Sequence, residues 1–303
     1  LREDLLKVLN EHKDLKPLDD DLRELFKSWF NPGFLKLAKI TWDTKAAVLE
    51  KIMKYERVHE IKDMDELKRR LGEDRRFFSY FHPALEDEPI IFVQVALTNG
   101  LGKSIQEITK PRTEGDKNYD SATFYSISNC QEGLSRVTLG NFLIKRVVFE
   151  IQEELPNIKN FGTLSPIPGF RDWFTTLDET IIQSILGKIT YTNISFLKNS
   201  NLKVGDGRIV SNKNAIIKLV GHYLINEKNK KDLPINDVCR FHLGNGAIID
   251  DIVINANVSE VGFNRSFGVM VNYLYELKNI EKNHEDYINN KKIIVSEKLK
   301  KII

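Results

Sequence analysis

Cysteine is scarce in this 303-residue chain, which contains only Cys130 and Cys239. Neither residue lies in a Cys-x-x-Cys pair or a Cys/His cluster, so the sequence argues against a structural zinc site and against a disulfide framework. We therefore expect a reducing, intracellular location, either the cytoplasm or an organelle matrix. The last three residues, 301–303, are Lys-Ile-Ile and do not form the Ser-Lys-Leu address of peroxisomal proteins.

Long apolar runs and an excess of one charge are also absent. The longest apolar stretch, residues 89–97, has the length of a strand, whereas a membrane-spanning helix needs about 20 residues. Lys and Arg number 45 against 43 Asp and Glu, so the net charge is only +2. We therefore expect no membrane span and no nucleic-acid partner, and any phosphate group must be bound by a local arrangement of residues.

The hydrophobic periodicity changes near residue 73. Before this point strand signals are nearly absent, and the spacing predicts a helix at 18–30, a second from about 44 with Val48, Leu49, Ile52 and Tyr55 on one face, and a third from about 63 that stops at Gly72. After it, strands are predicted at 77–81, 90–97, 124–128, 161–164 and 248–254. Helices are predicted there at 139–153, 180–186, 215–225, 262–277 and 287–303. This order indicates an α+β fold with a helical domain at 1–72 and an α+β domain at 73–303. Because the first residues have the pattern of a helix interior, we expect the helical domain to be truncated at its N-terminus.

A strand, a glycine-containing loop and a helix follow one another between residues 124 and 148. Backbone N–H groups exposed at the start of a helix bind phosphate, Gly140 permits close approach, and Arg136 adds a positive charge. The same pattern also fits an ordinary strand–loop–helix connection. It matches neither the dinucleotide-binding fingerprint nor the Walker sequence.

Two further features are candidates for chemistry. Residues 164–169, Leu-Ser-Pro-Ile-Pro-Gly, predict a rigid turn that can hold the hydroxyl of Ser165 at the end of a strand. The alternative is a plain turn in which Ser165 caps the chain, and no Gly-x-Ser-x-Gly elbow supports a serine hydrolase. His242 lies just before a Gly-Asn-Gly turn, and the spacing alone favours a packed histidine over a catalytic one. The other histidines are expected at the surface (His12, His59, His284), in a turn (His82) or packed on a helix (His222).

Taken together, the sequence resembles the malonyl-CoA decarboxylase family in the order and approximate spacing of its motifs, from about residue 19 to about residue 298. The segments that carry the resemblance are 28–35, 49–52, 55–56, 58–61, 75–77, 81–85, 124–128, 139–140, 142–148, 164–170, 241–243, 245–247, 272–273 and 275. The resemblance implies an N-terminal helical bundle followed by a catalytic α+β domain like that of the GCN5-related N-acetyltransferases.

The resemblance also implies the residues of the site. The family's serine and histidine match Ser165 and His242, and an active-site tyrosine of the family matches Tyr275. The pyrophosphate of CoA is expected to contact Ser135, Arg136, Val137, Thr138, Leu139, Gly140 and Asn141. The chain departs from the family pattern at Arg136, where a glycine is common, and also at Gly244, Asp250 and Asp251.

Membership would make the protein a carboxy-lyase that converts malonyl-CoA to acetyl-CoA and CO2 through a thioester enolate, without a metal or an organic cofactor. Ser165 would contact the carboxylate and relay a proton, and His242, with a pKa near about 6.5, would act as general acid. The alternatives are an acyl-CoA-dependent N-acetyltransferase and a non-enzymatic binding protein built on the helical domain. We also expect a homo-oligomer formed through the helical domain, with Trp29 and Trp42 either at the interface or in the core.

Overall fold

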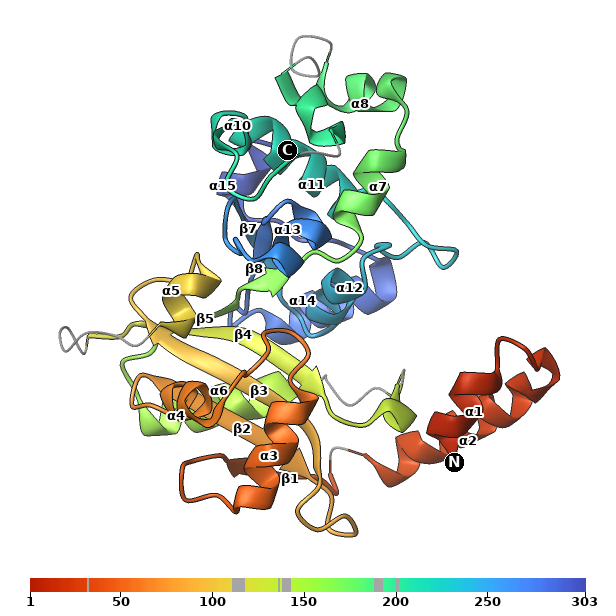
Figure 1. Ribbon diagram of the computed structural model, residues 1–303, viewed down its shortest axis with the longest axis vertical. Helices are drawn as coiled ribbons and strands as arrows, with labels where there is room; N and C mark the ends of the chain where they lie inside the picture. Colours follow the sequence, from red (N-terminus) through yellow and green to blue (C-terminus); the bar gives the residue numbers. More distant parts are fainter. Residues whose placement is uncertain (32, 111–117, 136, 138–142, 188–192, 200–201) are drawn as a thin grey trace. The chain divides into compact units, whose positions relative to one another are not determined.

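The computed structural model describes residues 1–31, 33–110, 118–135, 137, 143–187, 193–199 and 202–303. It shows a mixed α/β fold with an eight-stranded sheet (Figure 1). The chain divides into two compact units. Among the described residues, unit 1 contains residues 1–97 and 124–158, and unit 2 contains residues 98–110, 118–123 and 159–303.

Unit 1 is built on strands in the order β1-β2-β3-β4. The strands are β1 (Lys36–Lys39), β2 (Arg75–Phe81), β3 (Pro89–Thr98) and β4 (Ser121–Asn129), of which Thr98 and residues 121–123 belong to unit 2. The helices are α1 (Arg2–Val8), η1 (Lys13–Leu15), α2 (Lys16–Trp29), α3 (Ala46–Tyr55), α4 (Met64–Arg70), η2 (Glu132–Leu134) and α6 (Leu143–Glu154).

A core cluster of unit 1 lies between helices α3 and α4 and the antiparallel pair β2–β3. Helix α3 buries Val48, Leu49 and Ile52, the face that the sequence predicts, against Phe77 of β2 and Phe92 of β3. Full burial of one such side chain contributes about 1.5–3 kcal/mol. Periodicity alone therefore located α3 correctly.

Two expectations for the first part of the chain are wrong. Strand β1 pairs antiparallel with β2, although no strand was expected before residue 73. Its sequence, Lys-Leu-Ala-Lys, gives no alternating apolar pattern because a short edge strand with lysines stays partly exposed. His59 was expected at the surface but is buried, because the segment after α3 brings its ring to 6.3 Å from that of Tyr125.

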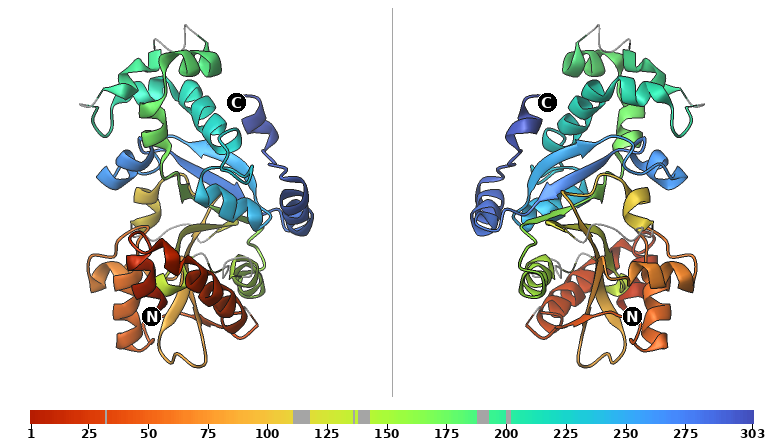
Figure 2. Two further views of the ribbon diagram at one scale, coloured as in Figure 1. Left: turned by 90° about the vertical axis from the view of Figure 1, so that its right-hand side faces the viewer. Right: turned by 90° about the vertical axis from the view of Figure 1, so that its left-hand side faces the viewer.

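Unit 2 is organised around β8 (Met270–Leu274), which pairs antiparallel with β5 (Asn160–Thr163), β6 (Ser165–Pro166) and β7 (Ile248–Val253). Its helices are α5 (Ile105–Thr109), α7 (Phe170–Thr176), α8 (Glu179–Leu186), η3 (Ser195–Lys198), α10 (Gly207–Ser211), α11 (Lys213–Ile225), α12 (Asp237–Gly244), α13 (Glu260–Ser266), α14 (Ile280–Asn290) and α15 (Glu297–Lys300). Figure 2 shows the dark blue α15 near the lighter blue strands, in agreement with its packing on β7.

The helix predicted at 262–277 is wrong, because the segment contains both α13 and β8. Helix α13 ends where Phe267 and Gly268 adopt positive φ angles of 55° and 80°, and the chain then extends into β8. The helix predicted at 287–303 is also interrupted. Helix α14 ends at Asn290, the following Lys291 has a φ of 53°, and α15 begins after Ser296, whose side chain accepts a hydrogen bond from the backbone N–H of Leu299.

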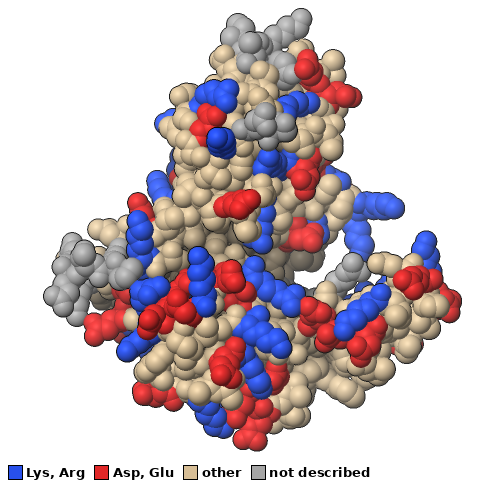
Figure 3. All heavy atoms as spheres, in the orientation of Figure 1, with Lys and Arg blue, Asp and Glu red and all other residues tan. Residues whose placement is uncertain are grey.

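The charged residues show no large region of one sign on the face drawn in Figure 3, where Lys and Arg are interspersed with Asp and Glu. Among the described residues, no helix is both long and apolar enough to cross a membrane.

Candidate active site

Ser165 is the first residue of β6 and is paired with Val271 of β8. The turn that follows is closely packed, since Ile167 is fully buried and Gly169 adopts a φ of 80° before α7 begins. A Cβ atom at Gly169 would lie 2.9 Å from the hydroxyl of Tyr223, so both the backbone conformation and the available space require glycine. The sequence motif therefore forms the rigid turn that its prolines and glycine predict.

Two side chains hold this turn through the carbonyl of Pro168. The Tyr223 hydroxyl donates to it at 3.1 Å, and the Nδ2 of Asn236 donates at 2.9 Å. Asn236 is also the N-cap of α12, where its Oδ1 accepts from the backbone N–H of Cys239 at 2.8 Å. One buried amide thus connects the turn that carries Ser165 with the start of the helix that carries His242.

Helix α12 places His242 on its buried face, together with Cys239 and Leu243. The imidazole stacks on the ring of Tyr273 from β8, with ring centroids 4.5 Å apart and an interplanar angle of 26°. The helix continues through Gly244, so the histidine lies in the last turn of α12, just before the turn at Asn245 and Gly246.

A chain of hydrogen bonds links four buried side chains of unit 2. Ser165 Oγ donates to Thr163 Oγ1 at 2.8 Å and is 2.9 Å from His242 Nε2. The other ring nitrogen, Nδ1, is 2.8 Å from the hydroxyl of Tyr275. The structure therefore brings together Ser165, His242 and Tyr275, the three residues expected to form the chemical part of the site.

Burial lowers the pKa of His242 from 6.5 to about 3. The cause is desolvation of the charged ring, since only 3% of the residue is exposed and its ring partners Ser165 and Tyr275 are hydroxyls, not carboxylates. The expectation of a pKa near 6.5 is therefore wrong, and His242 is neutral at pH 7. Burial also raises the pKa of Tyr275 well above its usual value of 10.

The segment expected to contact CoA is described only in part. Ser135 is exposed and Val137 is buried, both in unit 1. Arg136, Thr138, Leu139, Gly140 and Asn141 lie outside the described residues. Helix α6 follows this segment, as the sequence predicts.

Thr163 and Asn236 were missed by the sequence reasoning, although each leaves a signal. Thr163 lies two residues before Ser165, and alternate residues of an extended chain point to the same side. Asn236 comes before Asp237 at the start of a helix, which is the usual sequence of an N-cap. Neither signal indicates contact with the site, because the contacts depend on tertiary structure.

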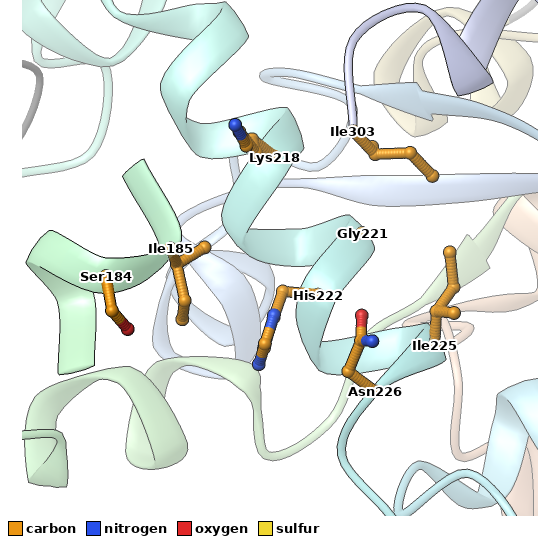
Figure 4. Close-up of a pocket in the computed structure, with 8 residues that line it drawn as sticks. All are labelled: Ser184, Ile185, Lys218, Gly221, His222, Ile225, Asn226 and Ile303. Atoms are coloured by element: carbon orange, nitrogen blue, oxygen red, sulfur yellow. The ribbon is translucent and has the colours of Figure 1, made fainter. Parts of the chain in front are cut away.

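Unit 2 also contains a pocket of about 440 Å³ between α8, α11 and the end of the chain. Figure 4 shows Ile185 and Ile303 on opposite sides of α11 in this view, with His222 and Asn226 from the end of that helix. Ser165, His242 and Tyr275 do not line this pocket. Within the described ranges, no group of three or more His, Cys, Asp or Glu side chains is arranged to hold a metal ion.

The family model of the malonyl-CoA decarboxylase C-terminal domain matches residues 33–303, and the model of the N-terminal domain of the same family matches residues 1–30. This chain belongs to the malonyl-CoA decarboxylase family. It is 36% identical to the mitochondrial malonyl-CoA decarboxylase of the goose Anser anser anser, over 94% of this chain and 61% of the goose protein. The chain thus spans less than two thirds of that relative.

Solved structures agree with this membership. The malonyl-CoA decarboxylase of Rhodopseudomonas palustris is 41% identical and superimposes with a TM-score of 0.91, over 99% of this chain and 74% of that one. A more distant structure, the GNAT-like decarboxylase GphF in complex with isobutyryl-CoA, is 14% identical and reaches a TM-score of 0.50 over 79% of this chain and 98% of that one. The second likeness concerns the fold alone and supports the expected acetyltransferase-like architecture.

Proposed function

We propose that this protein is a malonyl-CoA decarboxylase that converts malonyl-CoA to acetyl-CoA and CO2. The observation that carries the proposal is the buried contact between Ser165 and His242, the two positions that match the serine and histidine of the family. The names of the goose and Rhodopseudomonas palustris relatives support the same substrate. No comparable observation favours an N-acetyltransferase, which would need a base for an ammonium acceptor.

The reaction breaks the bond between the carboxylate carbon and the central carbon of malonyl-CoA. The bonding electron pair moves into the thioester, giving an enolate and CO2, and the enolate then takes up one proton at carbon. The protein must hold the carboxylate out of the thioester plane and remove water from it. It must also provide hydrogen-bond donors to the enolate oxygen and a proton to the carbon.

The neutral state of His242 changes the role assigned to it. A neutral imidazole is not the charged acid that was expected. It can still relay a proton, because one ring nitrogen can give a proton to Ser165 while the other accepts one from Tyr275. In the proposed sequence Ser165 gives its proton to the enolate carbon, His242 Nε2–H replaces that proton, and Tyr275 donates to Nδ1. Solvent finally restores the proton of Tyr275. The direction is favourable because a thioester enolate is more basic than a tyrosinate.

The test uses purified Ser165→Ala and His242→Gln proteins. We expect each to lose about 10²–10⁴-fold in kcat, the usual contribution of a positioned proton-transfer group. Acetyl-CoA and CO2 are measured from malonyl-CoA without any amine, which separates decarboxylation from acetyl transfer. Circular dichroism shows whether the variants fold. Near-normal kcat in both variants would contradict the roles assigned to Ser165 and His242. Absence of CO2 release by the parent protein would contradict the proposed function.

We propose a helical domain at 1–72, a catalytic domain at 73–303, and contact of residues 135–141 with the CoA pyrophosphate. Location in the cytoplasm or an organelle matrix stays a prediction, with a mitochondrial relative compatible with the second. Self-association through the helical domain is supported by exposed apolar residues of α2, namely Leu18, Leu25 and Trp29. Trp42 is exposed as well, and Lys68 lies over its ring.

A further inference from the structure

We propose that Thr163 is a positioning residue that sets the direction of the hydrogen-bond chain through Ser165 and holds His242 in the tautomer protonated at Nε2. Thr163 lies two residues before the serine and is the last residue of β5. The effect of Thr163 on catalysis rests on the proposed function, whereas its effect on the tautomer of His242 is independent of that function.

The Thr163 hydroxyl is buried and held between two donors. Its Oγ1 accepts from Ser165 Oγ at 2.8 Å and from the backbone N–H of Tyr273 at 3.3 Å. The backbone of Thr163 is fixed from the same strand, because Asn272 Nδ2 donates to its carbonyl at 2.7 Å. Only 1% of the residue is exposed, so water does not compete for these contacts.

The proton positions follow from the direction of the hydrogen bond between Ser165 and Thr163. Ser165 has one hydroxyl proton, and the structure directs it to Thr163 Oγ1. The 2.9 Å contact between Ser165 Oγ and His242 Nε2 then needs its proton from the ring, so Nε2 carries hydrogen. A neutral imidazole has only one N–H, which makes Nδ1 the acceptor of the Tyr275 hydroxyl at 2.8 Å.

This direction is the one that proton delivery requires. A substrate that takes the proton of Ser165 leaves an oxygen already facing the N–H of His242, and the ring faces the O–H of Tyr275. Every proton in the chain can therefore move one step toward Ser165. If the chain ran the other way, Ser165 would donate to Nε2, and no proton on the ring would face the serine.

Removal of the Thr163 hydroxyl should reverse the direction of the hydrogen bonds that link Ser165, His242 and Tyr275. In Thr163→Val the Ser165 proton loses its acceptor, while its neighbours Leu164 and Ile167 are fully buried apolar residues. A buried hydroxyl without an acceptor is costly, so the proton should turn to Nε2 and the ring should shift its own proton to Nδ1. Thr163→Ser keeps the hydroxyl and should keep the original direction.

The decisive measurement is the ¹⁵N NMR spectrum of protein labelled in its six histidines. The signals of His242 are assigned by their loss in His242→Gln. We expect the Nε2–H tautomer in the parent protein and in Thr163→Ser, and the Nδ1–H tautomer in Thr163→Val, with Thr163→Ala used if the valine variant does not fold. An Nδ1–H parent, or a valine or alanine variant that keeps Nε2–H, would overturn the proposal.

A kinetic measurement tests the link to catalysis with a matched control. Thr123 is equally buried in unit 2, and its Oγ1 accepts from the backbone N–H of Gly102 at 2.8 Å and lies 3.0 Å from the hydroxyl of Thr98. We expect Thr163→Val to lower kcat at least about 10-fold with little change in KM, and Thr163→Ser to restore it. Thr123→Val should lose similar stability but keep kcat.

The two measurements separate the possible failures. Equal kcat losses in Thr163→Val and Thr123→Val would show a general loss of packing and contradict the positioning role. A parent protein without decarboxylase activity would refute the proposed function, and the NMR result would still decide whether Thr163 sets the tautomer.

Discussion

The imidazole of His242 occupies an environment that opposes charge. It is packed against the ring of Tyr273, and its two nitrogens contact the hydroxyls of Ser165 and Tyr275. Among the residues that the structure describes, no carboxylate compensates for the lost hydration of the ring, so its uncharged form is favoured. The residue is therefore better suited to transfer a proton between hydroxyl groups than to hold an additional proton as an imidazolium.

This environment makes stability depend on pH through His242. Its pKa is about 3 in the folded protein and 6.5 when exposed in the unfolded chain, so the unfolded state binds more protons between these values. The free energy of unfolding should therefore fall as pH drops below 6.5, by up to about 1.4 kcal/mol per pH unit until about pH 3. Urea unfolding of the parent and of His242→Gln at several pH values between about 7 and 4 measures this slope.

The glutamine variant serves as the control, since its side chain is polar but does not titrate. In this pH range, the free energy of unfolding of the parent should depend on pH more steeply than that of the variant, by the amount that corresponds to the uptake of about one proton on unfolding. Parallel curves for parent and variant would mean that His242 already binds its proton in the folded state, in contradiction to the burial argument.

At the scale of elements, the site depends on the connection between a turn and a helix. Asn236 caps α12 and also donates to the Pro168 carbonyl, so the two segments that carry His242 and Ser165 share one amide. The distance of 2.9 Å between Ser165 and His242 should respond to this connection. A shift of the turn by a fraction of an ångström is enough to weaken a hydrogen bond of that length.

Asn236→Ser tests the connection while keeping the cap. Serine caps helices about as well as asparagine but is too short to reach the Pro168 carbonyl. We expect kcat to fall about 10-fold with a smaller change in KM, and stability to fall by about 1 kcal/mol for one buried hydrogen bond. Kinetics with malonyl-CoA and thermal unfolding measure the two effects.

The matched control is Asp63→Ser at the cap of α4 in unit 1, where the aspartate accepts from the backbone N–H of Glu66 at 2.7 Å. This exchange also replaces one good cap by another, and it should leave kcat unchanged. If Asn236→Ser behaved in the same way, the shared amide would have no role in holding the site.

The elements also show where sequence periodicity is informative. Helices α2, α3 and α11 were predicted because their apolar residues repeat at helical spacing over many residues. Strand β8 was missed because Phe263, Phe267, Val271 and Leu274 follow each other at intervals of four, four and three, which is also helical spacing. The break lies at Phe267 in a left-handed conformation, which a phenylalanine seldom adopts and therefore does not signal.

The same limit applies to the site. The resemblance to the family identified Ser165, His242 and Tyr275, and the structure places these side chains in one hydrogen-bond chain. Thr163 and Asn236 could not be assigned, because their partners come from other segments brought close by the pairing of β8 and by the start of α12. The pKa of His242 was also beyond the sequence, since it depends on how completely the ring is buried.

At the scale of the whole molecule, the first two helices form a hairpin that is well fixed at one end. Arg2 donates to Asp19 at 2.9 Å and to the carbonyls of Gly133 and Ser135 at 2.6 and 2.8 Å, and both charged side chains are almost fully buried. Breaking a buried pair by removing one partner costs about 3–5 kcal/mol. Figure 1 shows α1 and α2 side by side, in agreement with their contacts.

The open face of this hairpin is apolar. Leu18, Leu25 and Trp29 of α2 are 48%, 41% and 55% exposed, and their spacing of seven and four residues places them on one side of the helix. Exposed apolar residues aligned in this way are typical of surfaces that another protein covers. In the proposed self-association, a second copy of the same chain covers this surface.

The prediction is that Leu25→Gln combined with Trp29→Gln lowers the oligomeric state of the protein, because both changes remove apolar area that association would bury. Light scattering coupled to gel filtration measures the mass of the parent and of the variant over a range of concentrations. The control replaces Val261 and Ile288 of unit 2, which are 55% and 57% exposed, by glutamine and should leave the mass unchanged. A parent that is already monomeric at every concentration, or a control that dissociates equally, would show that α2 does not form the interface.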